Sequence, residues 1–314
     1  MATTAILIIG AHGQLGSVLT GELQKIYGKQ NIIATDIVPK TNVEGIFEHI
    51  DATDGKALER IVTKYAITEI YHLAAILSAK GEQYPLRTWE VNMNMTLHVF
   101  DVARKHKVDK VFFPSSIAVF GDHAPKENTP QWAPLNPTTV YGMSKAAGEH
   151  WAQYYFNTYG LDVRSLRYPG VVGYQPVSGG GTTDYAVEIY QSAVRQQPYT
   201  CFLKPDTKLP MIYMDDAIRA TIELMLAPKE NIKTRTSYNL GSMSFCPSEV
   251  AAAIQRTYPN FSMEYAPDFR QKISEKWPHS IDDGQARKDW GWKPKHDLES
   301  MTKLILAKLN KNMS

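Results

Sequence analysis

Short apolar segments alternate with amphipathic segments from residue 5 to about residue 170. The apolar segments predict buried strands at residues 5–9, 31–35, 70–75, 111–113 and 162–166, and another strand is expected to end near residue 51. Between them, apolar side chains recur at helical spacing around residues 19–26, 89–105 and 141–159. This alternation predicts an α/β fold, a Rossmann-type doubly wound parallel sheet with helices on both faces.

A glycine-rich turn joins the first predicted strand to the first predicted helix. It reads Gly10-Ala-His-Gly13-Gln14-Leu15-Gly16. Glycine lets the backbone approach a pyrophosphate closely, and the positive end of the following helix attracts the charge. The spacing G-x-x-G-x-x-G differs from the G-x-G-x-x-G fingerprint, and glycines also mark plain turns. The order of strand, turn and helix favours a dinucleotide site.

An acidic residue, Asp36, stands at the end of the second predicted strand. A carboxylate there can accept both ribose hydroxyls of an adenosine and repels a 2′-phosphate, so the sequence favours NAD over NADP. Lys40 lies near enough to Asp36 that NADP stays an alternative cofactor. Asp51 and Ala52 follow the third strand and are expected at the adenine, although Asp54 can equally be a helix N-cap.

Small residues follow the fourth predicted strand. Leu73, Ala74 and Ala75 are expected to lie against the cofactor, with Ser78 just beyond them at the crevice. Ligands of open α/β sheets bind at the carboxyl ends of the strands. His72 lies within the apolar segment, so a structural core histidine is favoured over a catalytic one.

Tyr141 and Lys145 are four residues apart, where the helical pattern of 141–159 begins. They share a helix face, and the ammonium is expected to lower the phenol pKa from about 10. Ser115 and Ser116 follow strand 111–113 and are expected to reach the same substrate oxygen. A lone Tyr-x-x-x-Lys pair is usually an ordinary helix pair, but the combination with these serines indicates alcohol–ketone chemistry.

Composition excludes several classes of protein. A chain of 314 residues that is 43% hydrophobic can bury a large core, and a net charge of +2 without a basic, aromatic block argues against nucleic-acid binding. Residues 5–9 are too short to span a bilayer and lack a basic leader, and mean hydropathy is −0.31, so a cytoplasmic protein without membrane contact is expected. Cys201 and Cys246 have no metal-ligand partners at usable spacing, so no metal is expected.

After about residue 170 the pattern becomes irregular and rich in prolines and aromatic residues. We expect residues 1–170, with a return segment at about 210–242, to form an NAD-binding Rossmann domain. Residues 171–209 and 243–314 are expected to form a smaller C-terminal lobe that binds substrate over the crevice.

These motifs together resemble the extended short-chain dehydrogenase/reductase family, which includes NAD-dependent epimerases and dehydratases. The resemblance covers nearly the whole chain and extends to Asn92, to 214–217 and to 290–294. It implies NAD as cofactor, contacts to it from Asn92, Tyr168 and Pro169, and Tyr141 as the base. It also implies a homodimer built from the helices 89–105 and 141–159.

Within that family, residues 178–186 and 277–283 resemble the short-chain L-threonine 3-dehydrogenases. This implies that NAD oxidises the β-hydroxyl of threonine, with Ser78, Thr182, Thr183 and Asp184 as substrate contacts. The glycines of 179–184 are expected to act as the hinge of a clamp over the substrate.

Two alternatives stay open. A nucleotide-sugar epimerase or dehydratase would use the same cofactor, although Gly170 stands where those enzymes carry an asparagine that helps to hold the diphosphate. A cofactor-sensing protein without turnover would be expected to lack Tyr141 and Lys145.

Overall fold

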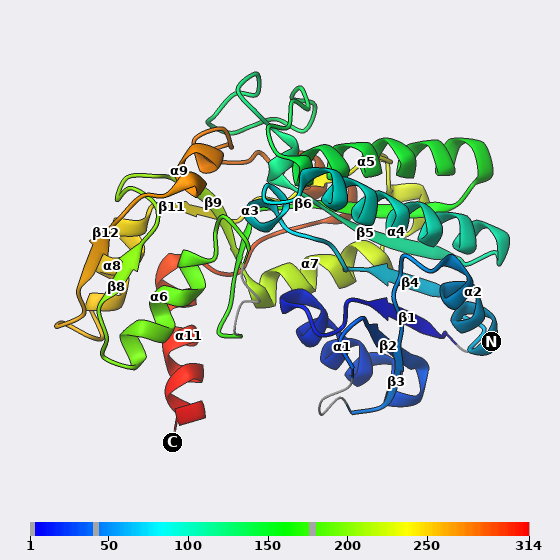
Figure 1. The fold of residues 1–314 in the computed structure, drawn as a ribbon, viewed down its shortest axis with the longest axis horizontal. Coiled ribbons are helices and arrows are strands. Elements are labelled where there is room, and N and C mark those ends of the chain that lie inside the picture. Colours follow the sequence, from blue (N-terminus) through cyan, green and yellow to red (C-terminus); the bar gives the residue numbers. More distant parts are fainter. Residues whose placement is uncertain (1–3, 40–43, 176–179, 314) are drawn as a thin grey trace.

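The computed structural model describes residues 4–39, 44–175 and 180–313. Its centre is a parallel sheet of seven strands in the order β10-β6-β5-β4-β1-β2-β3 (Figure 1). The strands are β1 Ile6–Ile9, β2 Ile32–Asp36, β3 Ile46–His49, β4 Glu69–His72, β5 Lys110–Ser116, β6 Asp162–Tyr168 and β10 Tyr238–Asn239. The α/β fold class and the parallel, doubly wound sheet are confirmed.

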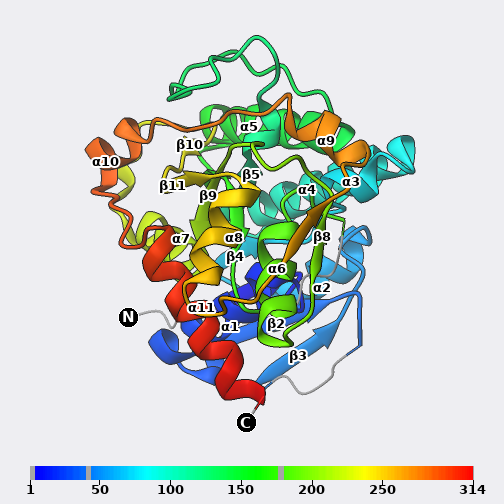
Figure 2. The ribbon, with the colours of Figure 1, turned by 90° about the vertical axis from the view of Figure 1, so that its left-hand side faces the viewer.

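Helices cover both faces of this sheet (Figures 1 and 2). On one face lie α1 Gln14–Tyr27 and α7 Met214–Leu226, and on the other lie α2 Gly55–Lys64, α4 Pro85–Lys105 and α5 Val140–Tyr159. Ile6 and Ile8 belong to one hydrophobic cluster, whereas Leu7 and Ile9 belong to the other. Since strand side chains alternate in direction, a continuous apolar run is what a sheet buried on both faces requires.

The remaining elements form two smaller sheets and a group of helices. The strands are β7 Gly170–Val172, β9 Leu209–Tyr213 and β11 Met243–Phe245 in one sheet, and β8 Tyr199–Cys201 and β12 Met263–Tyr265 in the other. The helices are α3 Ser78–Gly81, α6 Tyr185–Val194, α8 Pro247–Gln255, α9 Phe269–Ser274, α10 Gly284–Trp290 and α11 Leu298–Met313. The division into two domains stays a prediction. The separation of the two smaller sheets from the seven-stranded sheet favours it.

Two strands extend further than predicted. Strand β5 continues through Pro114 to Ser116, and β6 continues to Tyr168. Pro114 lies beyond Phe112, the last residue of β5 that pairs with β4, so its missing amide costs no bond to that strand. After β6, Gly170–Val172 forms the short strand β7, which pairs with β9.

The helix predicted at 89–105 starts earlier, at Pro85, where proline suits the first turn. Its apolar residues Met95, Val99 and Val102 are buried against the sheet, so they cannot form the expected contact between subunits. Ile26 of α1, predicted on the inner face, is instead 52% exposed.

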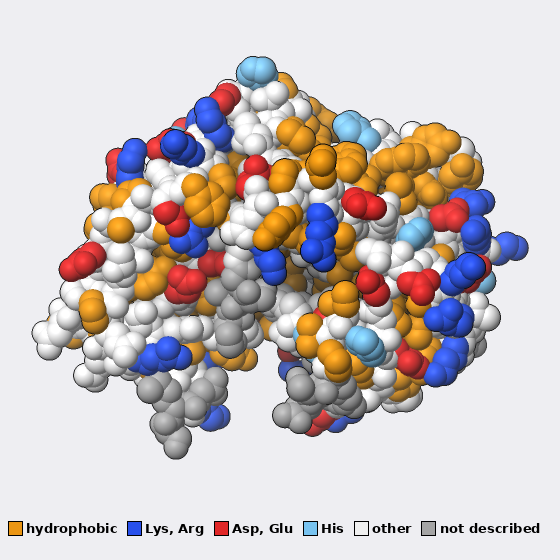
Figure 3. All heavy atoms as spheres, viewed as in Figure 1, with side chains coloured by type: hydrophobic (Ala, Val, Ile, Leu, Met, Phe, Trp, Pro, Cys, Tyr) orange, Lys and Arg blue, Asp and Glu red, His pale blue; other side chains and the backbone are white. Residues whose placement is uncertain are grey.

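Exposed aromatic residues lie elsewhere on α4 and α5. They are Trp89, Trp151, Tyr154 and Tyr159. Figure 3 shows a hydrophobic surface at its upper right, where Figure 1 places α5. Because periodicity alone identifies one apolar face, it did not separate the buried positions from this second, exposed set.

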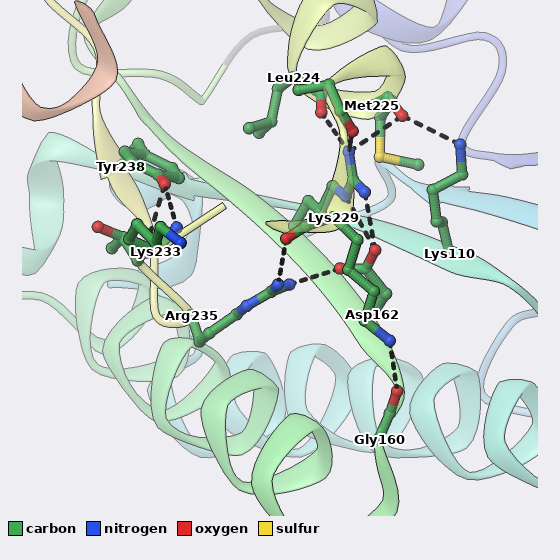
Figure 4. A network of polar contacts seen from close by, with 12 residues as sticks. Lys110, Gly160, Asp162, Leu224, Met225, Lys229, Lys233, Arg235 and Tyr238 are labelled. Carbon is green, nitrogen blue, oxygen red and sulfur yellow. Dashed lines mark hydrogen bonds and ion pairs between the residues drawn. The ribbon is translucent and has the colours of Figure 1, made fainter. Parts of the chain in front are cut away.

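A polar network fixes α7 to the amino end of β6 (Figure 4). The buried Arg164 guanidinium donates to the carbonyls of Leu224 and Ala227 at 2.7 and 2.6 Å and pairs with Asp162 at 2.8 Å. A cation at a helix C-terminus stabilises its unpaired carbonyls. Among the helices of the described residues, none is both long enough and apolar enough to cross a bilayer.

Candidate active site

The glycine turn opens helix α1 at the carboxyl end of β1. Its N-cap, Gly13, provides no side-chain cap, so the first amides of α1 are available to a ligand. A Cβ on Gly16 would lie 2.1 Å from the carbonyl oxygen of Gly10, and Gly10 itself has φ +88°. Only glycine therefore permits this close turn, and the turn fits a pyrophosphate.

Asp36 closes the same end of β2 and is 9% exposed. Its carboxylate accepts the amides of His12 at 2.9 Å and Val38 at 3.0 Å. These bonds hold the carboxylate beside the glycine turn, as a ribose contact requires. Lys40 lies outside the described residues.

The segment after β4 lies against the glycine turn, since a Cβ on Gly10 would lie 2.7 Å from the amide nitrogen of Ala74. Leu73, Ala74 and Ala75 are partly accessible there. Asn92 holds the end of this segment, accepting from the Ile76 amide at 2.9 Å and donating to its carbonyl at 3.1 Å. The side chain of Asn92 thus fixes the segment that is predicted to lie against the cofactor.

The other predicted cofactor residues differ in what they offer. Asp51 is exposed, Ala52 is buried, and Asp54 caps α2 through the amides of Lys56 and Ala57. Gln14 donates to the carbonyl of Val171 at 3.4 Å, which joins the glycine turn to β7, and Leu15 packs on the core.

Tyr168 points into the core, where its hydroxyl bonds to Thr221 of α7, and Pro169 is buried beside it. Because both side chains are buried, Tyr168 and Pro169 can present mainly backbone atoms to a ligand.

His72 is a core histidine, as favoured from the sequence. It is 1% exposed, and its Nε2 lies 3.4 Å from the Thr96 hydroxyl. Burial, together with the nearby charge of Lys145, lowers the pKa of His72 to about 3. It is neutral at physiological pH and is not a proton carrier there.

Tyr141 and Lys145 lie on the first turns of α5. The Lys145 Nζ is 5.6 Å from the centroid of the Tyr141 ring and 4.7 Å from that of Phe113. Thr139 caps the helix by accepting the amide of Gly142 at 3.1 Å. The cap fixes the first turn of α5, and with it Tyr141.

Burial dominates the acidity of both groups. It raises the pKa of Tyr141 to about 12, partly offset by a hydrogen bond with Ser116, and lowers the pKa of Lys145 to about 7. The expected net lowering of the Tyr141 pKa is therefore wrong for this structure, because burial of the phenol outweighs the interactions that favour its ionised form. Burial removes the water that would stabilise the charged form of each group. The spacing of the two residues in the sequence does not reveal this free-energy cost.

The two serines face opposite ways, as neighbours on a strand must. Ser116 bonds to the Tyr141 hydroxyl, whereas Ser115 is 1% exposed and donates to Glu149 at 2.6 Å. Only Ser116 therefore lies beside the Tyr141 hydroxyl, and the Ser115 side chain points away from the reacting groups.

The loop before α6 is docked on α3. The amide of Ala79 donates to Gly180 at 3.0 Å, and the hydroxyls of Ser78 and Thr182 lie 3.0 Å apart. Asp184 accepts the Gly181 amide at 2.9 Å, and burial raises the pKa of its carboxyl. Thr183 packs beside Gly170. Gly179, part of the predicted hinge, lies outside the described residues.

Sequence reasoning missed two buried residues, Glu149 and Arg167, that lie directly behind this site. The sequence shows only that Glu149 follows Lys145 by four residues and so shares its helix face. The burial of Glu149 and its pairing with Arg167 arise from the fold. Among the described residues, no group of three or more His, Cys, Asp or Glu side chains could hold a metal ion.

The profile of the NAD dependent epimerase/dehydratase family matches residues 6–241. An uncharacterised epimerase/dehydratase of Staphylococcus haemolyticus is 46% identical over 308 residues, which cover 96% of each chain.

Two solved structures are similar over nearly their full length. The GalE-like L-threonine dehydrogenase from Cupriavidus necator, in its holo form, is 50% identical with a TM-score of 0.95, over 97% of this chain and 99% of that one. A monomeric L-threonine 3-dehydrogenase from a metagenome is 47% identical with a TM-score of 0.96, over 98% and 100%.

Proposed function

The chain belongs to the NAD dependent epimerase/dehydratase family, and we propose that it is an NAD-dependent oxidoreductase that converts the 3-hydroxyl of L-threonine to a ketone, giving 2-amino-3-oxobutyrate. The observation that carries this proposal is the Tyr141 hydroxyl, bonded to Ser116 and followed one turn later by the buried Lys145. The similarity to two L-threonine dehydrogenases over nearly their full length supports the choice of substrate.

Each residue of the site has a separate role in the proposed reaction. When bound, NAD supplies the hydride acceptor for the carbon–hydrogen bond and a positive charge in the crevice. The open amides after Gly13 hold its pyrophosphate, and Asp36 holds the adenosine ribose. Tyr141 as phenolate takes the hydroxyl proton, while Ser116 fixes the reacting oxygen. Lys145, in its protonated form, favours the phenolate.

A nucleotide-sugar epimerase is the weaker candidate. A side chain on Gly170 would meet Met211 Sδ at 2.3 Å and Thr183 at 3.0 Å, so the crevice has no room here for a diphosphate-binding asparagine. An alcohol panel that contains hydroxy amino acids and sugar nucleotides tests the choice by NADH formation. NADH released with threonine supports the proposal, whereas epimerisation of a sugar nucleotide without net NADH contradicts it.

For the substrate, we expect Thr182→Ala to raise the KM for threonine and to lower kcat/KM at least about tenfold, or ~1.4 kcal/mol. The buried hydroxyls of Thr182 and Ser78 lie 3.0 Å apart, and together they can bind the carboxylate or amine of a small zwitterion. Steady-state kinetics checks this result.

Thr182→Ser is the matched control, since it keeps the hydroxyl and should stay near wild-type kinetics. Affinity for NAD should not change in either variant. If threonine kinetics are unaltered in Thr182→Ala, the residue is not a substrate contact.

For assembly, we propose a homodimer through the exposed aromatic face of α4 and α5 defined above. One structural neighbour is described as monomeric, so family membership alone does not fix the state. Light scattering at micromolar concentration should give twice the chain mass, and Trp151→Lys with Tyr154→Glu should halve it. Phe269→Glu, at an exposed aromatic on α9, is the control and should leave the mass unchanged; a wild-type monomer would contradict the dimer.

A further inference from the structure

A buried ion pair lies behind the reacting groups. Glu149 is 0% exposed and Arg167 is 3% exposed, and the guanidinium Nε and Nη2 donate to the two carboxylate oxygens at 2.9 and 2.7 Å. The pair is bidentate, which fixes both distance and orientation. The proposed reaction assigns neither residue a role.

The pair joins the three elements that carry the site. Glu149 lies on α5, two turns after Tyr141 and one turn after Lys145, so the three share one face of the helix. Arg167 lies on β6 directly opposite Ser115 of β5, and the Ser115 hydroxyl donates to Glu149 at 2.6 Å. The next residue of β5 is Ser116, the partner of the Tyr141 hydroxyl.

The outer side of the guanidinium is equally constrained. Its Nη1 donates to the carbonyl of Gln131 at 2.9 Å and to Asn239 Oδ1 at 3.1 Å. Asn239 in turn donates to the carbonyls of Thr129 and Asp282 at 3.0 and 3.1 Å. The network therefore extends from α5 to the chain that precedes α5 and to the segment that follows β12.

We propose that Glu149 and Arg167 are positioning residues, which set the distance between Tyr141 on α5 and Ser116 on β5. The two oxygen-bearing groups lie on different elements, and the Glu149 carboxylate is bonded to both β5 and β6 beside them. A shift of α5 by a fraction of an ångström moves Tyr141 away from the reacting oxygen, and displacements of about 1 Å can cost about a hundredfold in rate. This inference rests on the proposed oxidation.

The test is Glu149→Gln, which keeps the shape of the side chain and removes its charge. We expect the single-turnover rate of NADH formation, per NAD-binding site, to fall at least tenfold, with the Kd for NAD changed less than twofold. A residue that only stabilises the fold would lower Tm and the number of binding sites but not the rate per site.

Asp162→Asn is the matched control, because Asp162 forms a comparable buried pair with Arg164 at the opposite end of the same strand (Figure 4). It should lower Tm and leave the rate per site at the wild-type value. If Glu149→Gln behaves like this control, the positioning role is overturned.

Ser115→Ala is the second variant in case Glu149→Gln does not fold. It removes one bond to Glu149 and should lower the single-turnover rate at least threefold without raising the KM for threonine. A wild-type rate, or a change in KM alone, contradicts the inference. A wild-type protein inactive on threonine contradicts the proposed function instead, and the variants are then compared on the alcohol that the substrate panel identifies.

Discussion

Tyr141→Phe should abolish most turnover of threonine, with a loss in kcat of about a thousandfold, while NAD still binds. The substitution removes only the hydroxyl, which is the proton acceptor of the proposed reaction and the partner of Ser116. General acid–base groups contribute about 10²–10⁴-fold to rates, which sets the expected size. NADH formation measures the loss, and fluorescence titration measures NAD affinity.

The pH profile provides the second readout for the same residue. Burial holds the pKa of Tyr141 near 12, so the base becomes more available as pH rises, and kcat/KM should increase toward alkaline pH. Burial lowers the pKa of Lys145 to about 7 while Tyr141 is neutral, and a phenolate formed beside it favours the protonated lysine in return. In Lys145→Ala the rise should therefore move to higher pH. Residual activity of Tyr141→Phe should lack this rise.

A near-normal kcat in Tyr141→Phe would show that Tyr141 is not the proton acceptor. Tyr155→Phe is a suitable control, because this tyrosine lies on the same helix, is buried within the core, and is far along α5 from the reacting groups. Its kinetics should stay close to those of the wild type.

NAD should be preferred over NADP by at least about a hundredfold in kcat/KM, and Asp36→Ser should narrow the gap. The Asp36 carboxylate is held by two backbone amides beside the glycine turn, so it cannot easily move away from a 2′-phosphate. Repulsion combines with the loss of charged hydrogen bonds to the ribose, each worth about 1.5–3 kcal/mol, and 1.4 kcal/mol is a factor of ten.

Asp36→Asn separates the two contributions, since it removes the charge but retains one acceptor oxygen. It should raise kcat/KM with NADP by a larger factor than it lowers kcat/KM with NAD. Initial rates with each cofactor at saturating threonine measure the ratio. Equal kcat/KM values for NAD and NADP in the wild type would contradict the role of Asp36.

Local patterns in the sequence determined much of this protein. Apolar runs separated by helical periodicity specify a sheet buried on both faces, and the motif 10–16 needs glycine for reasons of backbone geometry alone. The residues at the carboxyl ends of the strands could also be predicted, because all parallel strands deliver those ends to one edge of the sheet. Asp36, Ser115 and Ser116 are predicted in this way, whereas Tyr141 and Lys145 are predicted from their spacing at the start of a helical pattern.

The tertiary structure alone decided what each of these groups experiences. Spacing placed Lys145 one turn from Tyr141, but the burial that raises one pKa and lowers the other depends on the whole fold. Ser115 and Ser116 look equivalent in sequence, and only the pairing of β5 with β6 brings Arg167 and Glu149 to one of them. Burial and cross-strand partners arise from residues distant along the chain, so no local pattern contains them.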